Sequence, residues 1–190
     1  MMSRTAGVIA SLAACVLVGG CDGSQPRTTG SEAESVSVTP SAPSTDSDVA
    51  RWDPCDLSDA DIADAGLDVA SKKTDVAGVG FEGWRVCGWR DSGNVFDFVV
   101  MSSAHTLDEV RQRDDYVDFT ESTVGGHPAL QYRPAAAATN ALVCYVSVAV
   151  PSGMVDFKVQ NRYGVPGADA DPCVDARRLS GMFADELPQS

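Results

Sequence analysis

Residues 142–160 read LVCYVSVAVPSGMVDFKVQ, and this stretch decides the fold class. Apolar residues occupy every second position of its first half: Leu142, Cys144, Val146, Val148 and Val150. The same alternation returns after the turn at residues 151–153, with Val155, Phe157 and Val159 on one face. A period of two residues indicates strands, and so short a turn predicts an antiparallel hairpin.

Further strands are predicted on either side of this hairpin. Residues 84–90 and 95–101 flank the turn Ser92-Gly93-Asn94, and the alternation in the second of them points Phe96, Phe98 and Val100 toward the core. Weaker alternation at residues 116–124 and 128–132 surrounds a turn at residues 125–127. We expect about six strands in all.

Start and stop signals predict three helices. Ser58 precedes the first, which should end near Gly66; Thr106 opens a short second one to about residue 114; Asp171-Pro172 opens the third, over residues 174–186. Adjacent hairpins with amphipathic helices predict an α+β domain, a single helix-backed antiparallel sheet.

The N-terminal part of the chain predicts export and lipidation. Residues 1–20 have the basic start and apolar core of a signal peptide, too short to span a bilayer as a mature helix. Val18-Gly19-Gly20-Cys21 resembles a bacterial lipobox, so Cys21 is the expected site of acyl chains such as palmitate. Two alternatives remain: lipidation at Cys15 after Leu12-Ala13-Ala14, and an ordinary secretory signal in which Cys21 is not modified.

Composition changes abruptly after Cys21. Residues 21–50 are rich in Ser, Thr, Pro and acids without aromatic residues, which predicts a disordered tether. Residues 51–190 are expected to form the globular domain. The expected location is therefore the cell membrane, with the lipid anchor holding the domain on the extracytoplasmic face of the envelope.

The negative net charge of the chain argues against one class of partner. With 27 acids against 14 bases the formal charge is −13. Binding to nucleic acid needs a basic surface that displaces counterions, so nucleic acid is not an expected partner. Oligomeric state is left open by the sequence.

The four cysteines of the predicted domain favour disulfides, because an exported domain meets an oxidising compartment. Three connectivities are possible. We favour Cys55–Cys87 and Cys144–Cys173, since each would join a helix N-terminus to a neighbouring strand. Zinc is the weaker alternative because the spacing contains no Cys-x-x-Cys pair.

Catalytic and metal-binding patterns are weak. His105 and His127 are far apart in sequence, and no nucleophile or phosphate-binding motif accompanies them. An acidic run departs from the spacing of a calcium loop and is better explained by helix capping and a solvated face: Asp56, Asp59, Asp61, Asp64 and Asp68. We therefore expect no catalytic residues, no metal and no cofactor, and we expect the acids to stay at helix starts and polar faces, where burial is unfavourable.

One aromatic pair suggests a binding surface. Trp84 and Trp89 stand on opposite faces of one predicted strand, so one should pack in the core near a disulfide and the other be half exposed. The half-exposed ring is the only aromatic sign of a place where a ligand or partner could bind.

Several segments together resemble a known family. They are the lipobox, the tether, Trp52-Asp53-Pro54-Cys55, residues 84–89 (WRVCGW), Cys144 and Asp171-Pro172-Cys173. This series resembles a family of small actinobacterial lipoproteins that carry a domain of unknown function. The resemblance implies an envelope location and paired cysteines, and it implies no known reaction.

The leading hypothesis from sequence is a non-catalytic, lipid-anchored envelope protein that binds a ligand or a protein partner. An apolar cavity between helices and sheet would favour a small molecule or lipid, and a flat exposed patch would favour a protein. The alternatives are an envelope hydrolase with a dispersed active site and a structural cell-wall spacer.

Overall fold

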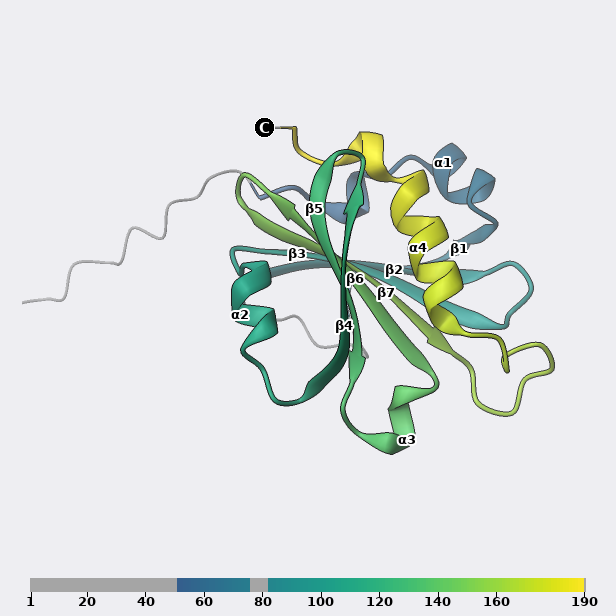
Figure 1. Cartoon of the computed structure of the whole chain (residues 1–190). Coiled ribbons are helices and arrows are strands. Elements are labelled where there is room, and N and C mark those ends of the chain that lie inside the picture. The colour runs from purple at the N-terminus through teal and green to yellow at the C-terminus, as the bar shows by residue number, and fades with distance from the viewer. Residues whose placement is uncertain (1–50, 76–81, 190) are drawn as a thin grey trace, which may run out of the picture. The chain divides into compact units, whose positions relative to one another are not determined.

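A computed structural model describes residues 51–75 and 82–189 of the chain. Within this part, seven strands form one sheet in which every neighbouring pair is antiparallel (Figure 1). The strands are β1 (Leu67–Lys73), β2 (Trp84–Asp91), β3 (Phe96–Ser103), β4 (Tyr116–Val124), β5 (His127–Pro134), β6 (Val143–Val150) and β7 (Gly153–Asn161). Their order across the sheet is β1-β2-β3-β7-β6-β5-β4. The predicted α+β class with an antiparallel sheet is confirmed.

The strand absent from the sequence prediction is β1. It is largely polar, with Asp68, Ser71, Lys72 and Lys73 among its residues, and its pairing with β2 is irregular between Asp68 and Lys73. An edge strand of this kind buries little, so it lacks the apolar alternation that identified the other strands.

The described helices are short. They are the α-helices α1 (Asp59–Asp64), α2 (Leu107–Arg111), α3 (Ala137–Asn140) and α4 (Pro172–Met182), with the 3-10 turns η1 (Pro54–Asp56) and η2 (Ala184–Glu186). The expected N-caps are present: Ser58, Thr106 and Asp171 each accept a backbone N–H of the first turn. The prediction for α2 was too long, because the helix ends at Arg111.

The two main hairpins form as their turns predict. In the β2–β3 turn, Asp91 accepts hydrogen bonds from the backbone N–H groups of Gly93, Val95 and Phe96 at 2.8, 2.5 and 2.7 Å. Such side-chain bonds replace ladder bonds at a chain reversal. The β6–β7 turn sets a register in which Ser147 lies opposite Asp156.

One face of the sheet carries the main hydrophobic core. The alternating residues Phe98, Val146 and Phe157 are at most 1% exposed there, and α1, α4 and both 3-10 turns contribute apolar residues to the same cluster. Stacking of Phe98 on Phe157 and on Phe183, with ring centroids 6.2 and 5.8 Å apart, packs the sheet against the segment after α4.

The opposite face is covered only in part. A smaller cluster lies there, in which Leu107 and Val110 of α2 pack with Leu130, Tyr132 and Met154 of the sheet. A helix of five residues cannot cover seven strands. We call this second side, on which Tyr132 and Met154 lie, the open face.

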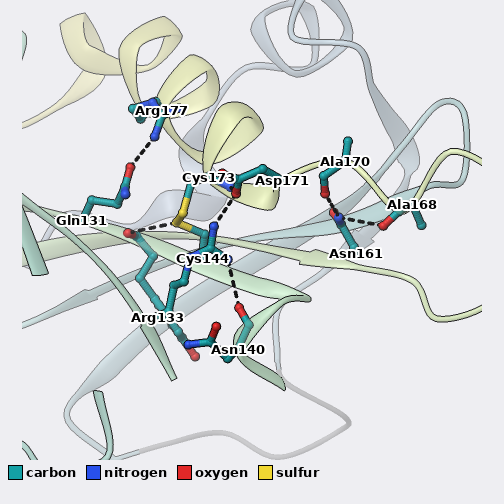
Figure 2. Close-up of polar contacts among 11 residues, drawn as sticks. Gln131, Arg133, Asn140, Cys144, Asn161, Ala168, Ala170, Asp171, Cys173 and Arg177 are labelled. Carbon is teal, nitrogen blue, oxygen red and sulfur yellow. Dashed lines mark hydrogen bonds and ion pairs between the residues drawn. A yellow bond between two sulfur atoms is a disulfide. The ribbon is translucent and has the colours of Figure 1, made fainter. Parts of the chain in front are cut away.

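Two disulfides join the cysteines in the predicted pairs. Cys55 of η1 is bonded to Cys87 of β2, and Cys144 of β6 is bonded to Cys173 in the first turn of α4. Each bond ties a helical N-terminus to a strand, as the sequence predicted. Figure 2 shows the second disulfide between strand and helix.

A polar network surrounds the second disulfide (Figure 2). Arg133 forms an ion pair with Asp171, the N-cap of α4, and donates to the backbone oxygen of Asn140 at 2.9 Å. Asn161, at the end of β7, donates to the backbone oxygens of Ala168 and Ala170 at 2.9 and 2.6 Å. These bonds and the disulfide hold the segment that leads into α4 against the sheet.

Candidate functional site

The open face contains one deeply buried carboxyl group. Asp156 of β7 is 3% exposed, although it alternates with the core residues Val155 and Phe157 and so points to the other side of the sheet. The open face thus buries a carboxyl group at this point. This finding corrects the sequence analysis, which expected the acids to lie at helix starts and polar faces.

Two hydroxyl groups contact Asp156. Ser147 donates to Asp156 Oδ1, and the Tyr132 hydroxyl lies 3.3 Å from the same oxygen and 2.8 Å from Ser147 Oγ. Burial raises the pKa of Asp156 to about 6, and these two hydrogen bonds and the charge of His105 oppose the rise. The carboxyl group therefore changes its charge close to neutral pH.

Tyrosine rings from three strands lie beside this carboxyl group. Tyr145 of β6 stacks on Tyr132 of β5 with centroids 5.0 Å apart and planes 4° apart. Tyr116 of β4 approaches these two rings at 5.6 and 4.7 Å respectively. Burial raises the pKa of all three tyrosines, so they remain uncharged hydrogen-bonding groups.

A bulge in β4 brings one more ring to this cluster. The register shifts between Val117 and Thr120, and Asp118 has a φ of 59°. Bulges insert an extra residue and turn the following side chains to the other face. Phe119 consequently lies 5.8 Å from the Tyr132 ring and is 38% exposed.

The segment before α2 and the helix itself supply the rim. His105 lies 5.3 Å from the Trp84 ring, and its Nδ1 is 3.4 Å from a carboxylate oxygen of Glu109. Arg113 stands over the Tyr116 ring at 5.1 Å. Arg113 also donates to Asp115 from Nε at 2.8 Å, so its charge is already neutralised locally.

These side chains enclose two adjoining hollows that share Trp84, Tyr116, Tyr132 and Asp156. The hollow beneath α2 has a volume of about 260 Å³ and also includes His105, Glu109, Val110, Arg113 and Met154. The second, of about 200 Å³, extends over Val86, Met101 and Tyr145. We call the two together the aromatic pocket.

The structure separates the two tryptophans as the sequence predicted. Trp89 is 3% exposed and packs in the main core with Cys87, whereas Trp84 is half-buried and lines the aromatic pocket. The two histidines also lie apart in the structure. His105 lies at the pocket rim, whereas the buried His127 is the first residue of β5, toward the other end of that strand from Tyr132.

The acidic run shows no metal-binding arrangement. Within residues 51–75 and 82–189, no three His, Cys, Asp or Glu side chains are grouped so that they could hold a metal ion. Ser58 accepts from the Asp61 backbone N–H at 3.1 Å and donates to the Asp61 carboxylate, which is the capping role expected from sequence.

Sequence reasoning missed Asp156, Ser147 and the three tyrosines. One signal was present: counting outward from the turn at residues 151–153 places Ser147 opposite Asp156, two polar residues in the middle of the most apolar hairpin. No comparable signal connects Tyr116 with Tyr132 and Tyr145, because the bulge in β4 determines their approach.

Comparison with known proteins shows the family. Residues 16–185 match the family described as "Protein of unknown function (DUF3558)", and the chain belongs to this family. No curated protein and no solved structure matches the chain. In the described part of the chain, none of the helices has the length and hydrophobicity needed to span a bilayer.

Proposed function

We propose that this protein is a lipid-anchored envelope lipoprotein of the actinobacterial type whose folded domain binds a small ligand in the aromatic pocket. The observation that carries this proposal is the pocket itself: aromatic and apolar walls around one buried carboxyl group, with His105, Glu109 and Arg113 at the rim, beneath a helix too short to fill the open face. Pockets with apolar walls and few polar groups are typical of small-molecule sites.

The shape of the pocket favours a small molecule over the other partners considered. A cavity between helix and sheet was the feature expected of a ligand-binding domain, and a flat patch that of a protein partner. Among residues 51–75 and 82–189, the most exposed large apolar side chains are Tyr163 and Val174, which are 92% and 55% exposed and lie outside the pocket. A purely structural spacer needs no such pocket.

Ligand binding is tested with benzyl alcohol, a small neutral aromatic probe. We expect the full chain, solubilised in dodecyl maltoside, to bind it, and Trp84→Ala to weaken binding by about tenfold, because an indole ring offers a large apolar contact. Titration calorimetry measures both. Tyr163→Ala is the matched control, since Tyr163 is 92% exposed and outside the pocket. Equal affinity for Trp84→Ala and wild type would exclude the pocket as the binding site.

The anchor is tested independently of the pocket. The apolar segment before Cys21 and the polar residues after it support lipidation at this cysteine. We expect Cys21→Ala to remove the protein from lipid labelling with a tagged fatty acid, while Cys15→Ala leaves labelling unchanged. Labelling that persists in Cys21→Ala would assign the anchor elsewhere.

An envelope hydrolase is the second candidate, and one observation favours it. Asp156 has a pKa of about 6 and accepts a hydrogen bond from Ser147, an arrangement of base and nucleophile. Ser147 is 0% exposed, however, so a substrate cannot reach its hydroxyl without movement of the sheet. Turnover of a nitrophenyl ester by wild type that Asp156→Asn abolishes would favour the hydrolase over the binding protein.

A further inference from the structure

The buried carboxyl group of the aromatic pocket has no ion-pair partner in the described part of the chain, and the only basic side chain that acts on it electrostatically is His105, at the rim of the same hollow. Both of its hydrogen bonds come from hydroxyl groups, Ser147 and Tyr132, and both reach Oδ1. No hydrogen bond to Oδ2 and no ion pair to Asp156 is made within residues 51–75 and 82–189. A buried charge of this kind is costly unless it is neutralised by a partner or by a proton.

The charged groups around the pocket are committed to other partners. Arg113 is held by Asp115, and His105 is paired with Glu109 at the rim. Lys158, two residues along β7, lies over the Tyr145 ring at 6.0 Å. Burial lowers the pKa of Lys158, and Asp97 opposes that shift. His105 also lowers the pKa of Asp156 through its charge, and the remaining titratable groups that face Asp156 are Tyr116, Tyr132 and Tyr145, which are uncharged.

The rings beside Asp156 are suited to a positive charge. The face of an aromatic ring is electronegative and attracts cations, most strongly where water is excluded. Two of these rings already attract cations of the protein itself: Arg113 lies over Tyr116, and Lys158 lies over Tyr145. Trp84, the ring type with the strongest attraction for cations, has no Lys or Arg of the described chain over it; its ring lies 5.3 Å from the His105 ring and lines the pocket.

We infer that the aromatic pocket binds a small organic cation, whose ammonium group lies against the rings of Trp84 and Tyr116 with Asp156 as its counter-ion. This inference rests on the proposed function and specifies its ligand class. Hollows of about 260 and 200 Å³ suit a compact ammonium group with a short substituent. In the ligand complex, the cation supplies the partner that Asp156 lacks.

The test compares choline with its uncharged carbon analogue, in which a tert-butyl group replaces the trimethylammonium group. The two probes have nearly the same shape, so a difference in affinity reports the charge alone. We expect the full chain in dodecyl maltoside to bind choline about tenfold more tightly than the analogue, a factor typical of a cation held by aromatic rings and a carboxylate. Titration calorimetry gives both affinities.

Two variants distinguish an effect of the Asp156 carboxyl group from an effect of the overall negative charge of the protein. Asp156→Asn keeps the size of the side chain and should remove the preference for choline while leaving the analogue bound. Asp97→Asn is the matched control: Asp97 lies on the same face of the sheet, with its side chain 47% exposed, outside the aromatic pocket. Asp97→Asn should keep the full preference.

The pH dependence gives a readout that requires no mutation. Choline affinity of the wild type should fall as pH decreases through about 6, where Asp156 becomes protonated, and affinity for the analogue should not. Circular dichroism verifies that Asp156→Asn is folded; if it is not, this pH comparison decides the question.

Failure of the inference and failure of the proposed function give different results. If choline and its analogue bind equally, the pocket binds ligands without selecting charge, and the inference is wrong. If neither probe binds and benzyl alcohol does not bind either, both are wrong. A preference that survives in Asp156→Asn assigns the cation site to other residues and overturns the role of Asp156.

Discussion

Asp156 shows how one residue links stability to the pocket. Its polar neighbours in the sheet are Ser147 and Tyr132, which donate hydrogen bonds to its carboxyl group but bring no charge. The folded protein therefore binds a proton at Asp156 more tightly than the unfolded chain does. When Asp156 is ionised and no ligand is bound, the buried charge lowers the free energy of unfolding.

We predict that Asp156→Asn stabilises the protein at neutral pH. The pKa of Asp156 rises from the ordinary 3.8 to about 6 on folding. Its contribution to the free energy of unfolding is therefore at its maximum below about pH 4, where the side chain is protonated, and is lost as pH increases through 6. The variant should gain about 3 kcal/mol over wild type across this window, by the free energy of a pKa shift. Urea unfolding at a series of pH values measures the difference. A difference that is constant with pH would contradict the assignment.

The residues that sequence analysis identified correctly are those governed by local rules. Ser58, Thr106 and Asp171 cap helices because their side chains satisfy free backbone N–H groups, and Phe98 and Phe157 are buried because they follow the period of two. Asp156 follows the same alternation, but its burial comes from α2 and from neighbouring strands, which local rules do not place.

At the scale of elements, the β6–β7 turn positions the pocket. Gly153 has a φ of 131°, and a Cβ at this position would lie 2.2 Å from the backbone oxygen of Ser103 and 2.7 Å from Cα of Ala104. Ser103 and Ala104 are followed in the chain by His105 and by Thr106, the N-cap of α2. The absence of a side chain at Gly153 thus lets the pocket rim pass directly over the hairpin.

Gly153→Ala should therefore cost more stability than a glycine substitution at an open turn. We expect a loss of about 3 kcal/mol, from backbone strain and displacement of the segment at residues 103–105. Gly126→Ala is the matched control: Gly126 also has a positive φ, 86°, but a Cβ added there would meet no atom within 4 Å beyond its chain neighbours. Its loss should be about 1 kcal/mol from strain alone. Similar unfolding midpoints for the two variants would contradict the close approach at Gly153.

The elements also show where sequence prediction stops. The β2–β3 and β6–β7 hairpins could be predicted because each turn and its apolar alternation are contiguous in sequence. The edge strand β1 could not, because its polar residues give no period. The placement of α2 on the side opposite α4 was also not predictable, since both helices have an apolar face and either face of the sheet could receive it.

At the scale of the whole molecule, two disulfides brace one side of the sheet. Both lie in the face that carries the main core, and they close segments with sequence separations of 32 and 29 residues. The open face has no such bond within the described residues. Stability is thus concentrated on the face opposite the aromatic pocket.

We predict that removing the second disulfide, by Cys144→Ser with Cys173→Ser, lowers the free energy of unfolding by about 3.6 kcal/mol, the loop-entropy value for a sequence separation of 29 residues. The network of Arg133, Asp171 and Asn161 should keep α4 near its place, so the variant should still bind benzyl alcohol. Chemical denaturation and calorimetry provide the two measurements. Loss of binding in a folded variant would show that the two faces are coupled.

If the proposed lipid anchor holds the chain at Cys21, the first disulfide has a mechanical consequence. Cys55 lies four residues after Arg51, and the chain between them is also attached by the Ser102 hydroxyl, which donates to the Trp52 backbone oxygen at 2.5 Å. A pull transmitted through residues 21–50 would reach β2 through a covalent bond before it could peel any strand from the sheet. Tension on such an anchor would be carried first by β2, which also supplies Trp84 and Val86 to the aromatic pocket, so the pull would act directly on one wall of the pocket.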